Sequence, residues 1–310
     1  MLELREVEKP AVPDDGVLVR VRACSVNPAD WHYVVGQPYL LRPSAGLRRP
    51  KDPRVGADFA GTVEAVGAAV EHFQPGDDVF GISGDSFAEY VCRPEDRAIV
   101  PKPSGLTFEQ AAAVPLAALT ALQGLRDKGR VQAGQKVLIN GASGGVGTFA
   151  VQIAKALGAE VTGVTSTQNV DLVRSLGADH VVDYTRGDFT RSGKRYDVLL
   201  DNAGGRSWSD VKRVLVEKGI LVRVGGPKGG PILGAVKHLL VMKVASIGSS
   251  QTVALFLAKP NRDDLLVLRD LVEEEKLRPA IDRTYELKEV PEALEYLGTK
   301  HARAKVVISV

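Results

Sequence analysis

The glycine turn at residues 142–147, ASGGVG, is the feature that most restricts how this chain can fold. It follows the apolar run KVLIN and precedes FAVQIAKALG, in which apolar residues recur at helical spacing. The turn fits the pattern G-x-G-x-x-G with Ala142 in the first position, Gly144 in the second and Gly147 in the third. A strand, a glycine turn and a helix in this order predict a dinucleotide-binding βαβ unit.

Both glycines of this pattern have a physical reason. Gly144 allows the backbone to approach a pyrophosphate, and Gly147 allows the helix to pack closely on the strand. The helix N-terminus adds unpaired N–H groups and the positive end of its dipole, which favour bound phosphates. A P-loop is excluded, because no Gly-Lys-Ser/Thr sequence follows the turn. The remaining alternative is a tight glycine turn in an α/β domain that binds no nucleotide.

The end of the second predicted strand, residues 165–169, has the sequence TSTQN and contains no acidic residue. Sites for NAD usually place an Asp or Glu here, on the ribose 2′-hydroxyl. A carboxylate repels a 2′-phosphate, whereas hydroxyls, amides and a helix N-terminus can donate hydrogen bonds to it. The segment therefore favours NADPH over NADH, although it lacks the Arg or Lys that would strengthen this preference.

The pattern of apolar and polar residues changes twice along the chain. Short alternating apolar runs, punctuated by Pro, Gly and Asp, predict a β-barrel-like unit up to residue 106. Strands and helices then alternate up to residue 260, with a last strand expected near residues 243–248, and predict a doubly wound parallel sheet. The final segment has too little apolar surface to fold alone. We therefore expect one domain from residues 1–106 and 261–310, and a second from residues 107–260.

Composition excludes several classes of function. The 40 Lys and Arg residues nearly balance the 38 Asp and Glu residues, so a net charge of +2 gives no electrostatic case for nucleic-acid binding. With only Cys24 and Cys92, a disulfide framework is not expected and a reducing compartment is. The chain has no signal-peptide core and no apolar run of about 18 residues. These features predict a soluble cytoplasmic protein that does not bind membranes.

Several longer motifs occur together and in a characteristic order. They include VRACSVNPADW, GADFAGTVEAVG, FQPGDDVFG, LTFEQAAAVPLAALTAL, NGASGGVG and SLGADHVVDY. With them the chain resembles the medium-chain dehydrogenase/reductase superfamily, in its quinone-oxidoreductase branch, from about residue 2 to its end. The resemblance implies a GroES-like catalytic domain, a Rossmann domain, an active site in the cleft between them and a homodimer formed through the Rossmann domain. It also implies about a dozen more residues before residue 2, which form an initial strand, so we expect that this sequence either starts late or leaves a barrel edge unpaired.

Zinc dehydrogenases of this superfamily hold a catalytic metal with a Cys, a His and a third ligand. The corresponding positions here are Asn27, Ala57 and about Leu116, and none of these is a good zinc ligand. Cys24 and His32 are interpreted as structural residues. We therefore predict a zinc-free protein. Without a Lewis acid, reduction of a quinone or an activated C=C bond is easier than oxidation of a simple alcohol.

The resemblance also implies functional residues. Asn27 and Asp30 are the candidate catalytic residues, at the floor of the nicotinamide cleft. Thr120 would lie beside the nicotinamide ribose, and Ser166 and Tyr184 would contact the 2′-phosphate. The other cofactor candidates are Ser143, Gly144, Gly145, Val146 and Gly147 at the pyrophosphate, Asn202, Val224 and Gly225 along the far half of the cofactor, and Asn169 and Lys305.

Other interpretations remain open at this point. A short-chain dehydrogenase uses a Y-x-x-x-K pair, which Tyr296 and Lys300 could form. A non-catalytic NADPH-binding sensor or scaffold would have the same sequence features. Residues 33–54 carry five cations against one acid and could receive an anionic substrate or form a solvated loop. The substrate itself, whether a quinone, an enal, an enone or an enoyl thioester, is not specified.

Overall fold

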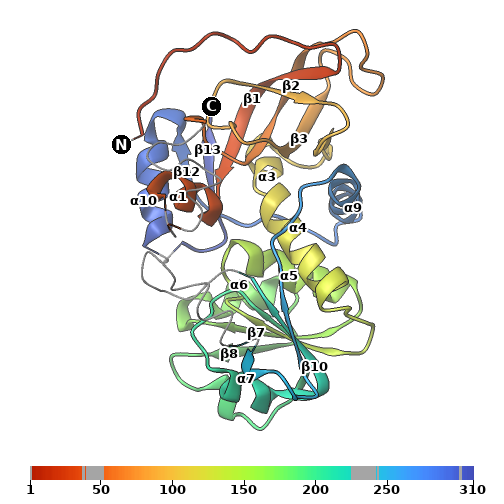
Figure 1. Ribbon diagram of the computed structural model, residues 1–310, viewed down its shortest axis with the longest axis vertical. Coiled ribbons are helices and arrows are strands. Elements are labelled where there is room, and N and C mark those ends of the chain that lie inside the picture. Colours follow the sequence, from red (N-terminus) through yellow and green to blue (C-terminus); the bar gives the residue numbers. More distant parts are fainter. Residues whose placement is uncertain (1, 37–38, 40–51, 225–241, 243, 300–301) are drawn as a thin grey trace. The chain divides into compact units, whose positions relative to one another are not determined.

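The computed structural model describes residues 2–36, 39, 52–224, 242, 244–299 and 302–310 (Figure 1). The described residues form two compact units. The first unit comprises those of Met1–Gly36, Leu41–Leu119 and Lys259–Val310, and the second those of Gln37–Leu40 and Thr120–Ala258. Both ends of the chain thus contribute to the first unit. Most of the cationic segment at residues 33–54 lies outside the described residues.

A seven-stranded sheet forms the first unit, in the order β12-β13-β1-β2-β3-β5, with β4 paired to β1. The last strand of the chain, β13, pairs antiparallel with β1, which explains why the C-terminal segment needs no core of its own. The strands are β1 Gly16–Val26, β2 Asp58–Val66, β3 Asp78–Ile82, β4 Tyr90–Pro94, β5 Ile99–Pro101, β12 Ile281–Glu286 and β13 Lys305–Ser309.

Two features shape the first unit: the close approach of strand β2 to strand β1, and the packing of its helices. A Cβ atom on Gly61 would lie 2.1 Å from the carbonyl oxygen of Arg20, so only glycine fits where β2 pairs with β1 next to a shift in their register. Helix α1, Pro28–Val35, packs against α10, Val290–Gly298 (Figure 1). The other helices of this unit are α3 Phe108–Ala112, η5 Leu287–Glu289 and α9 Arg262–Glu273.

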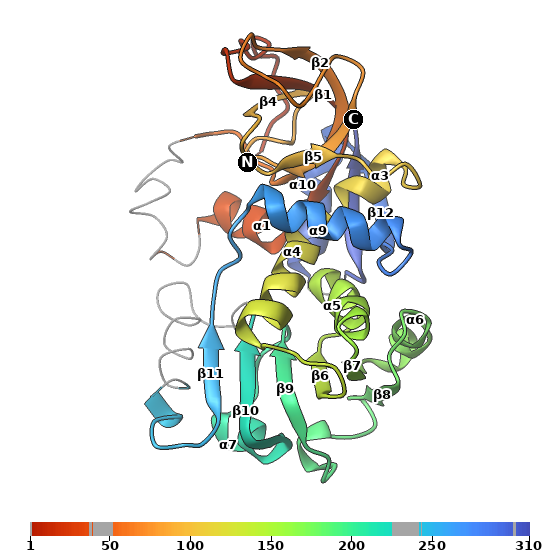
Figure 2. The same ribbon diagram turned by 90° about the vertical axis from the view of Figure 1, so that its right-hand side faces the viewer.

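A six-stranded parallel sheet forms the second unit, in the order β11-β10-β9-β6-β7-β8 (Figure 2). The chain runs outward from β6 to β8 and then returns to β9 on the other side of β6. The strand order therefore reverses between β6 and β9, which is the Rossmann switch point. The strands are β6 Lys136–Asn140, β7 Glu160–Thr165, β8 His180–Asp183, β9 Tyr196–Asp201, β10 Leu215–Arg223 and β11 Thr252–Leu255.

Helices cover both faces of this sheet. Val211 and Val214 of α7 share a core with Leu199 of β9, while Gly124 of η2 packs against Leu200, which points to the opposite face. This arrangement confirms the predicted fold of a Rossmann domain joined to a GroES-like domain. The helical segments are α4 Pro115–Gln123, η2 Gly124–Lys128, α5 Gly145–Ala156, η3 Thr167–Asn169, α6 Val170–Ser175, η4 Phe189–Arg191 and α7 Trp208–Val214.

One predicted strand is wrong. Residues 244–248 form the end of a helix and a turn, with Gly248 at a φ of 77°, and the edge strand β11 follows at Thr252–Leu255. A short apolar run does not distinguish strand from helix by its periodicity, which explains the error. No helix in the described part of the chain is long and apolar enough to cross a membrane.

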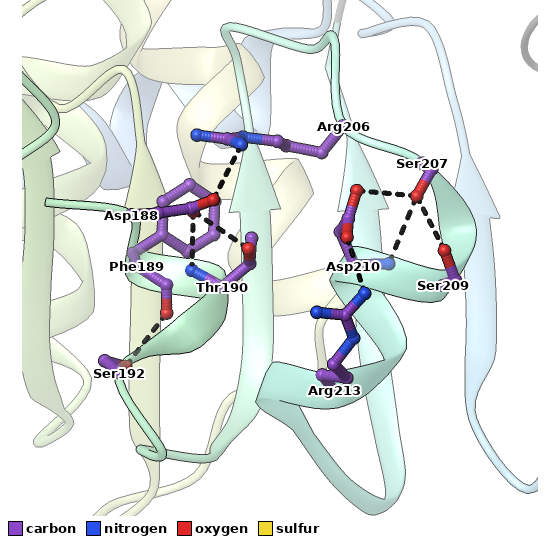
Figure 3. A network of polar contacts seen from close by, with 9 residues as sticks. All are labelled: Asp188, Phe189, Thr190, Ser192, Arg206, Ser207, Ser209, Asp210 and Arg213. Atoms are coloured by element: carbon purple, nitrogen blue, oxygen red, sulfur yellow. Dashed lines mark hydrogen bonds and ion pairs between the residues drawn. The ribbon is translucent and has the colours of Figure 1, made fainter.

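Polar side chains fix the start of α7 and the neighbouring turn η4 (Figure 3). Ser207 accepts a hydrogen bond from the Asp210 N–H, and Asp210 in turn accepts one from Arg213 at 2.9 Å. Arg206 donates to Asp188, at the start of η4, over 3.1 Å. These groups are partly or fully exposed, so they orient the two segments and contribute little to overall stability.

Candidate functional site

The glycine turn, which from here on includes the preceding Gly141 (residues 141–147), joins β6 to α5 at the carboxyl edge of the parallel sheet. A Cβ atom on Gly147 would lie 2.1 Å from the carbonyl oxygen of Gly141, so the packing of the turn itself requires this glycine. At Gly144 the nearest atom to such a Cβ would be 3.5 Å away, and the φ of −82° suits any residue. The fold does not require glycine at position 144, and close approach by a ligand is the remaining physical reason for it.

The turn is also accessible where a phosphate would bind. Residues 143–146 are partly exposed, whereas Ala142 and Gly147 on either side are buried. The first amides of α5 have no carbonyl partner within the helix, because a helix leaves its first N–H groups unpaired. The predicted pyrophosphate residues are thus brought together at one helix N-terminus. Their role in binding stays a prediction.

Polar side chains connect this turn to the end of β7. The Ser143 hydroxyl accepts hydrogen bonds from the Thr165 hydroxyl at 2.7 Å and from the Asn169 amide at 3.2 Å. The same amide group donates to the Ser166 hydroxyl at 3.1 Å. Three of the predicted cofactor residues, Ser143, Ser166 and Asn169, therefore form one connected group.

An acidic side chain near this group was missed by the sequence analysis. The carboxylate of Asp183, the last residue of β8, accepts hydrogen bonds from the Thr167 hydroxyl at 2.6 Å and from the Thr185 N–H at 2.9 Å. The hydrogen bond from Thr167 is the main cause that lowers the pKa of Asp183. Tyr184 follows it and is 57% exposed. The signal that could have identified Asp183 in the sequence is an acidic residue at the end of the third parallel strand, whereas only the end of the second strand was considered.

A row of buried polar side chains crosses the ends of β6, β9 and β10, and we call it the strand-end row: Asn140, Asp201 and Arg223. Asp201 accepts hydrogen bonds from the Asn140 amide and from an Arg223 Nη atom, each at 2.8 Å. It also accepts one from the Gly204 N–H at 2.8 Å, which shapes the turn after β9. The sequence analysis did not assign this row, although each member is a polar residue at the end of an apolar strand.

Asn202 lies in the turn that Asp201 holds. Its backbone N–H donates to the carbonyl of Asn140 at 3.1 Å. The side-chain nitrogen and oxygen of Asn202 are buried and have no hydrogen-bond partner among the described residues. Buried polar atoms of this kind normally have partners. The role of Asn202 in cofactor binding stays a prediction. Val224 directly follows the end of β10, Thr120 is a half-buried residue of α4, and Gly225 lies outside the described residues.

The first unit contains a second buried polar group, which we call the ion cluster: Ser25, Asn27, Asp58 and Lys305. The Lys305 ammonium donates to the Asn27 Oδ1 atom at 2.7 Å and lies 3.3 Å from the Asp58 carboxylate. The Asn27 Nδ2 atom and the Ser25 hydroxyl donate to the same Asp58 oxygen at 2.9 and 2.7 Å. Lys305, a predicted cofactor residue, is thus turned toward Asn27, a predicted catalytic residue.

Asp30 borders this cluster from helix α1. Its carboxylate accepts a hydrogen bond from the backbone N–H of Asn27 at 2.8 Å, which fixes the first turn of the helix. Burial, together with the nearby charge of Asp58, raises the pKa of Asp30 to about 7. Near neutral pH this carboxyl group therefore exists in both protonation states.

The positions that correspond to zinc ligands do not fit a metal ion. The amide of Asn27 is engaged by Lys305 and Asp58, and a buried ammonium next to it repels a cation. The Leu116 position offers a backbone N–H, which donates to Asp58 at 2.8 Å. Within the part of the chain that the structure describes, no group of three His, Cys, Asp or Glu side chains could hold a metal ion.

The other two residues considered as metal ligands have structural surroundings. Cys24 is fully buried in an apolar cluster, and burial raises the pKa of its thiol, which disfavours the thiolate that binds metals. The ring of His32 lies edge-on to Trp31, with the ring centroids 5.1 Å apart. Both observations agree with the structural interpretation of these residues.

The Tyr296 side chain does not have the environment of a short-chain dehydrogenase tyrosine. Its hydroxyl donates to Asp282 at 2.7 Å, and burial with this acid raises its pKa. A tyrosine that transfers a proton needs a lowered pKa. Tyr296 also lies on α10 in the first unit and not in the Rossmann unit, and Lys300 lies outside the described residues.

Known dehydrogenases and oxidoreductases are similar to this chain over nearly its whole length. Residues 13–104 match the family described as alcohol dehydrogenase GroES-like domain, and residues 176–308 match the family described as zinc-binding dehydrogenase. The chain is 35% identical to the mitochondrial NAD(P)H oxidoreductase RTN4IP1 of Mus musculus, over 95% of this chain and 81% of that protein. It is 34% identical to a chloroplastic quinone-oxidoreductase homolog of Spinacia oleracea, over 98% and 93% of the two chains.

A solved structure is similar over the same extent. The quinone oxidoreductase from Coxiella burnetii superposes with a TM-score of 0.84 and 32% sequence identity, covering 98% of this chain and 93% of that one.

Proposed function

This chain belongs to the medium-chain dehydrogenase/reductase superfamily, and we propose that it transfers a hydride from NADPH to a quinone or to the activated C=C bond of an enone or enal. The names of its relatives support the broader assignment of an NAD(P)H-dependent oxidoreductase. The observation that carries the proposal is the open position at Gly144, above the N-terminus of α5. A glycine that the fold itself does not need is explained by a pyrophosphate in contact with the backbone.

The residues around this position suit NADPH. The amides of residues 143–147 would hold the pyrophosphate at the helix N-terminus. Ser166 and Asn169 offer a hydroxyl and an amide for the adenosine 2′-phosphate, and the exposed Tyr184 can lie against the same end. Asp183 is an acid close to these residues, and its oxygens are engaged by Thr167 and Thr185. The unpartnered amide of Asn202 would bind a polar group of the other half of the cofactor.

When bound, NADPH supplies the hydride, and the protein contributes orientation and electrostatics. Asn27 would offer an amide N–H to the oxygen of the acceptor, where negative charge develops as the hydride arrives. The acceptor then takes one proton, so that a quinone becomes a hydroquinone or an enone a saturated ketone. Asp30, with a pKa of about 7, is able to hold such a proton near neutral pH.

Steady-state oxidation of NADPH in the presence of a panel of quinones, enones and enals tests this proposal. We expect turnover well above the uncatalysed rate with at least one of these acceptors. Tight NADPH binding without turnover would instead support a non-catalytic sensor or scaffold. Elemental analysis of the purified protein tests the zinc-free prediction, because stoichiometric zinc would overturn it.

The preference for NADPH has its own test, which compares the dissociation constants of NADPH and NADH. We expect Ser166→Ala to weaken NADPH binding by about tenfold, or ~1.4 kcal/mol, and to leave NADH binding unchanged. Thr167→Ala is the matched control, because this hydroxyl is already engaged by Asp183. Equal affinities of the unaltered protein for the two cofactors would refute the preference.

Two further predictions accompany this function. A homodimer is expected to form through the Rossmann unit, where β11 is the edge strand of the sheet. Size-exclusion chromatography with light scattering measures this directly. The cytoplasmic location expected from the sequence also stays a prediction, and the relatives named above are mitochondrial and chloroplastic.

A further inference from the structure

The ion cluster lies where three strands of the first unit meet. Asn27 directly follows β1, Asp58 begins β2 and Lys305 begins β13. Both β2 and β13 run antiparallel to β1, so their first residues lie beside its end, with Ser25 paired to Asp58 and Val26 paired to Val306. The side chains of Lys305 and Asp58 are 3% and 0% exposed. Burying two charges is costly, so their presence here needs a reason beyond stability.

The chemistry of these partners determines how the Asn27 amide is oriented. A lysine ammonium has only donors, and a carboxylate has only acceptors. The amide oxygen must therefore face Lys305 at 2.7 Å, and the amide nitrogen must face Asp58 at 2.9 Å. A flipped amide would place its NH₂ group against the ammonium and its oxygen against the carboxylate, and would lose both hydrogen bonds.

The Asp58 carboxylate is itself held in place from several directions. Its Oδ1 atom accepts a hydrogen bond from the Leu116 backbone N–H at 2.8 Å, and its Oδ2 atom accepts one from the Ser25 hydroxyl at 2.7 Å. Lys305 also lies 3.4 Å from the carbonyl oxygen of Val26. Asp58 is thus anchored to the backbone of helix α4 and Lys305 to the backbone of strand β1, and Asn27 is held between them.

One hydrogen-bond donor of the ion cluster makes only a long hydrogen bond among the described residues. The Asn27 Nδ2 atom carries two hydrogens, of which one is donated to Asp58. Among the described residues, the other is donated to the carbonyl oxygen of Ser25 at 3.4 Å, which is a long hydrogen bond. All other hydrogen bonds of the amide are short, so this N–H is the one that a substrate oxygen could take.

We propose that Lys305 and Asp58 are positioning residues for the reduction: they hold Asn27 so that its amide N–H, and not its oxygen, is presented to the substrate oxygen. The inference rests on the proposed function. The Lys305 ammonium places a fixed positive charge beside the position where zinc dehydrogenases have a metal ligand, which accounts for the misfit of that position to zinc. In the reduction the hydride carries two electrons to the acceptor, the charge develops on its oxygen, and a proton completes the product.

The central experiment compares Lys305→Met with Lys305→Arg. We expect Lys305→Met to lower kcat for quinone or enone reduction about 10-fold to 100-fold, somewhat less than the loss of a direct donor to an oxyanion. The dissociation constant of NADPH should change less than about twofold. Lys305→Arg retains a side chain with only donors and should recover most of kcat.

Lys102→Met is the matched control, because the Lys102 side chain is also buried in the first unit, donates to the carbonyls of Pro103 and Leu106 and lies 4.0 Å from the half-exposed Asp78, outside the ion cluster. It should leave kcat unchanged. An unchanged kcat in folded Lys305→Met would overturn the inference. A loss of NADPH affinity with little change in kcat would also overturn it, and would support Lys305 as a cofactor residue instead.

NMR of the Asn27 side-chain amide gives a readout that needs no activity. The two amide protons should exchange slowly and resonate apart in the unaltered protein, and Lys305→Met should accelerate their exchange and bring them together. The Asn27→Asp variant identifies the signal by its disappearance. This variant also keeps an oxygen that accepts a hydrogen bond from Lys305 but removes the amide N–H, so it should lower kcat. It therefore tests the inference even if Lys305→Met does not fold.

The two proposals fail in different ways. If the unaltered protein reduces no acceptor, the proposed function fails, and the NMR comparison alone decides whether the amide is held. If the unaltered protein is active and both Lys305→Met and Asn27→Asp match it, only the positioning role fails.

Discussion

The glycine turn of the second unit and the ion cluster of the first unit both lie at strand ends, but their residues are separated very differently along the chain. The glycine turn occupies residues 141–147. In the ion cluster, Asn27 contacts Asp58 across 31 positions and Lys305 across 278. The first is built from backbone conformation within one crossover, whereas the second exists only after both chain ends have joined one sheet. Substitutions in the turn should therefore act on cofactor binding and local packing, and those in buried charged groups on the stability of the fold.

The largest effect is expected from Asp201→Ala in the strand-end row. The substitution leaves Arg223, whose side chain is fully buried, without its charged partner, and it removes the acceptor for Asn140 and Gly204. Breaking a buried ion pair in this way costs about 3–5 kcal/mol. Urea unfolding should show this loss. A change below about 1 kcal/mol would mean that Arg223 finds water or another partner.

The pH dependence of stability tests the surroundings of Asp30 in the first unit. Its folded pKa of about 7 lies above the ordinary pKa of 3.8 for an aspartic acid, so the folded state binds more protons between these pH values than the unfolded state. The contribution of Asp30 to stability is therefore full below about pH 4 and is lost as the pH rises through 7. Lys305, Asp58 and Cys24 are the other titratable groups that interact with it.

Asp30→Asn provides the comparison, because the amide oxygen can still accept the Asn27 N–H and does not ionise. Relative to the unaltered protein, this variant should gain about 2–4 kcal/mol between pH 4 and pH 8. Unfolding measured at several pH values checks it. Parallel stability curves for the two proteins would contradict the raised pKa.

Within the glycine turn, Gly147→Ala should destabilise the second unit. The added Cβ would lie 2.1 Å from the Gly141 carbonyl oxygen, and backbone atoms cannot move aside cheaply. Overpacking of this kind costs about 1–3 kcal/mol. Thermal unfolding without cofactor measures the effect. A variant as stable as the unaltered protein would show that α5 can shift away from β6.

Gly144→Ala is the matched substitution three positions earlier. Its Cβ would meet no atom closer than 3.5 Å, so stability should be nearly unchanged. The methyl group would occupy the space assigned to the pyrophosphate, and NADPH binding should weaken about tenfold, or ~1.4 kcal/mol. Calorimetric titration with NADPH decides this. Unchanged affinity would remove the main support for a pyrophosphate at this turn.

The smallest effect is expected from Arg213→Ala, in the exposed network at the start of α7 (Figure 3). This pair is three residues apart on a helix surface, and such pairs contribute about 0.3–0.5 kcal/mol. Neither NADPH binding nor kcat should change. A loss above about 1 kcal/mol would show that this network stabilises the unit more than its exposure suggests.

Prediction from the sequence succeeded where the signal is local. The strand, glycine turn and helix around Gly144 predicted the Rossmann fold, and the change in the pattern of apolar residues near residue 107 predicted a β-barrel-like unit before it. The family resemblance implied that this unit is GroES-like. The strand near residues 243–248 was wrong, because a short apolar run fits helix and strand equally well. Asp183 was missed because the analysis considered only the end of the second strand, and Thr167 is brought to Asp183 by the pairing of β7 with β8.

The amino-acid sequence by itself determined the dinucleotide fold and the residues of the glycine turn, and through the family resemblance it also showed which residues occupy the zinc-ligand positions: Asn27, Ala57 and about Leu116. These features depend on residue type and on spacing within a few positions. Only the tertiary structure decided that Lys305 lies against Asn27 and Asp58, and that Asp30 shares their buried environment. The physical reason is that antiparallel pairing of β1 with β2 and β13 sets these contacts, and no local pattern in the chain encodes that register.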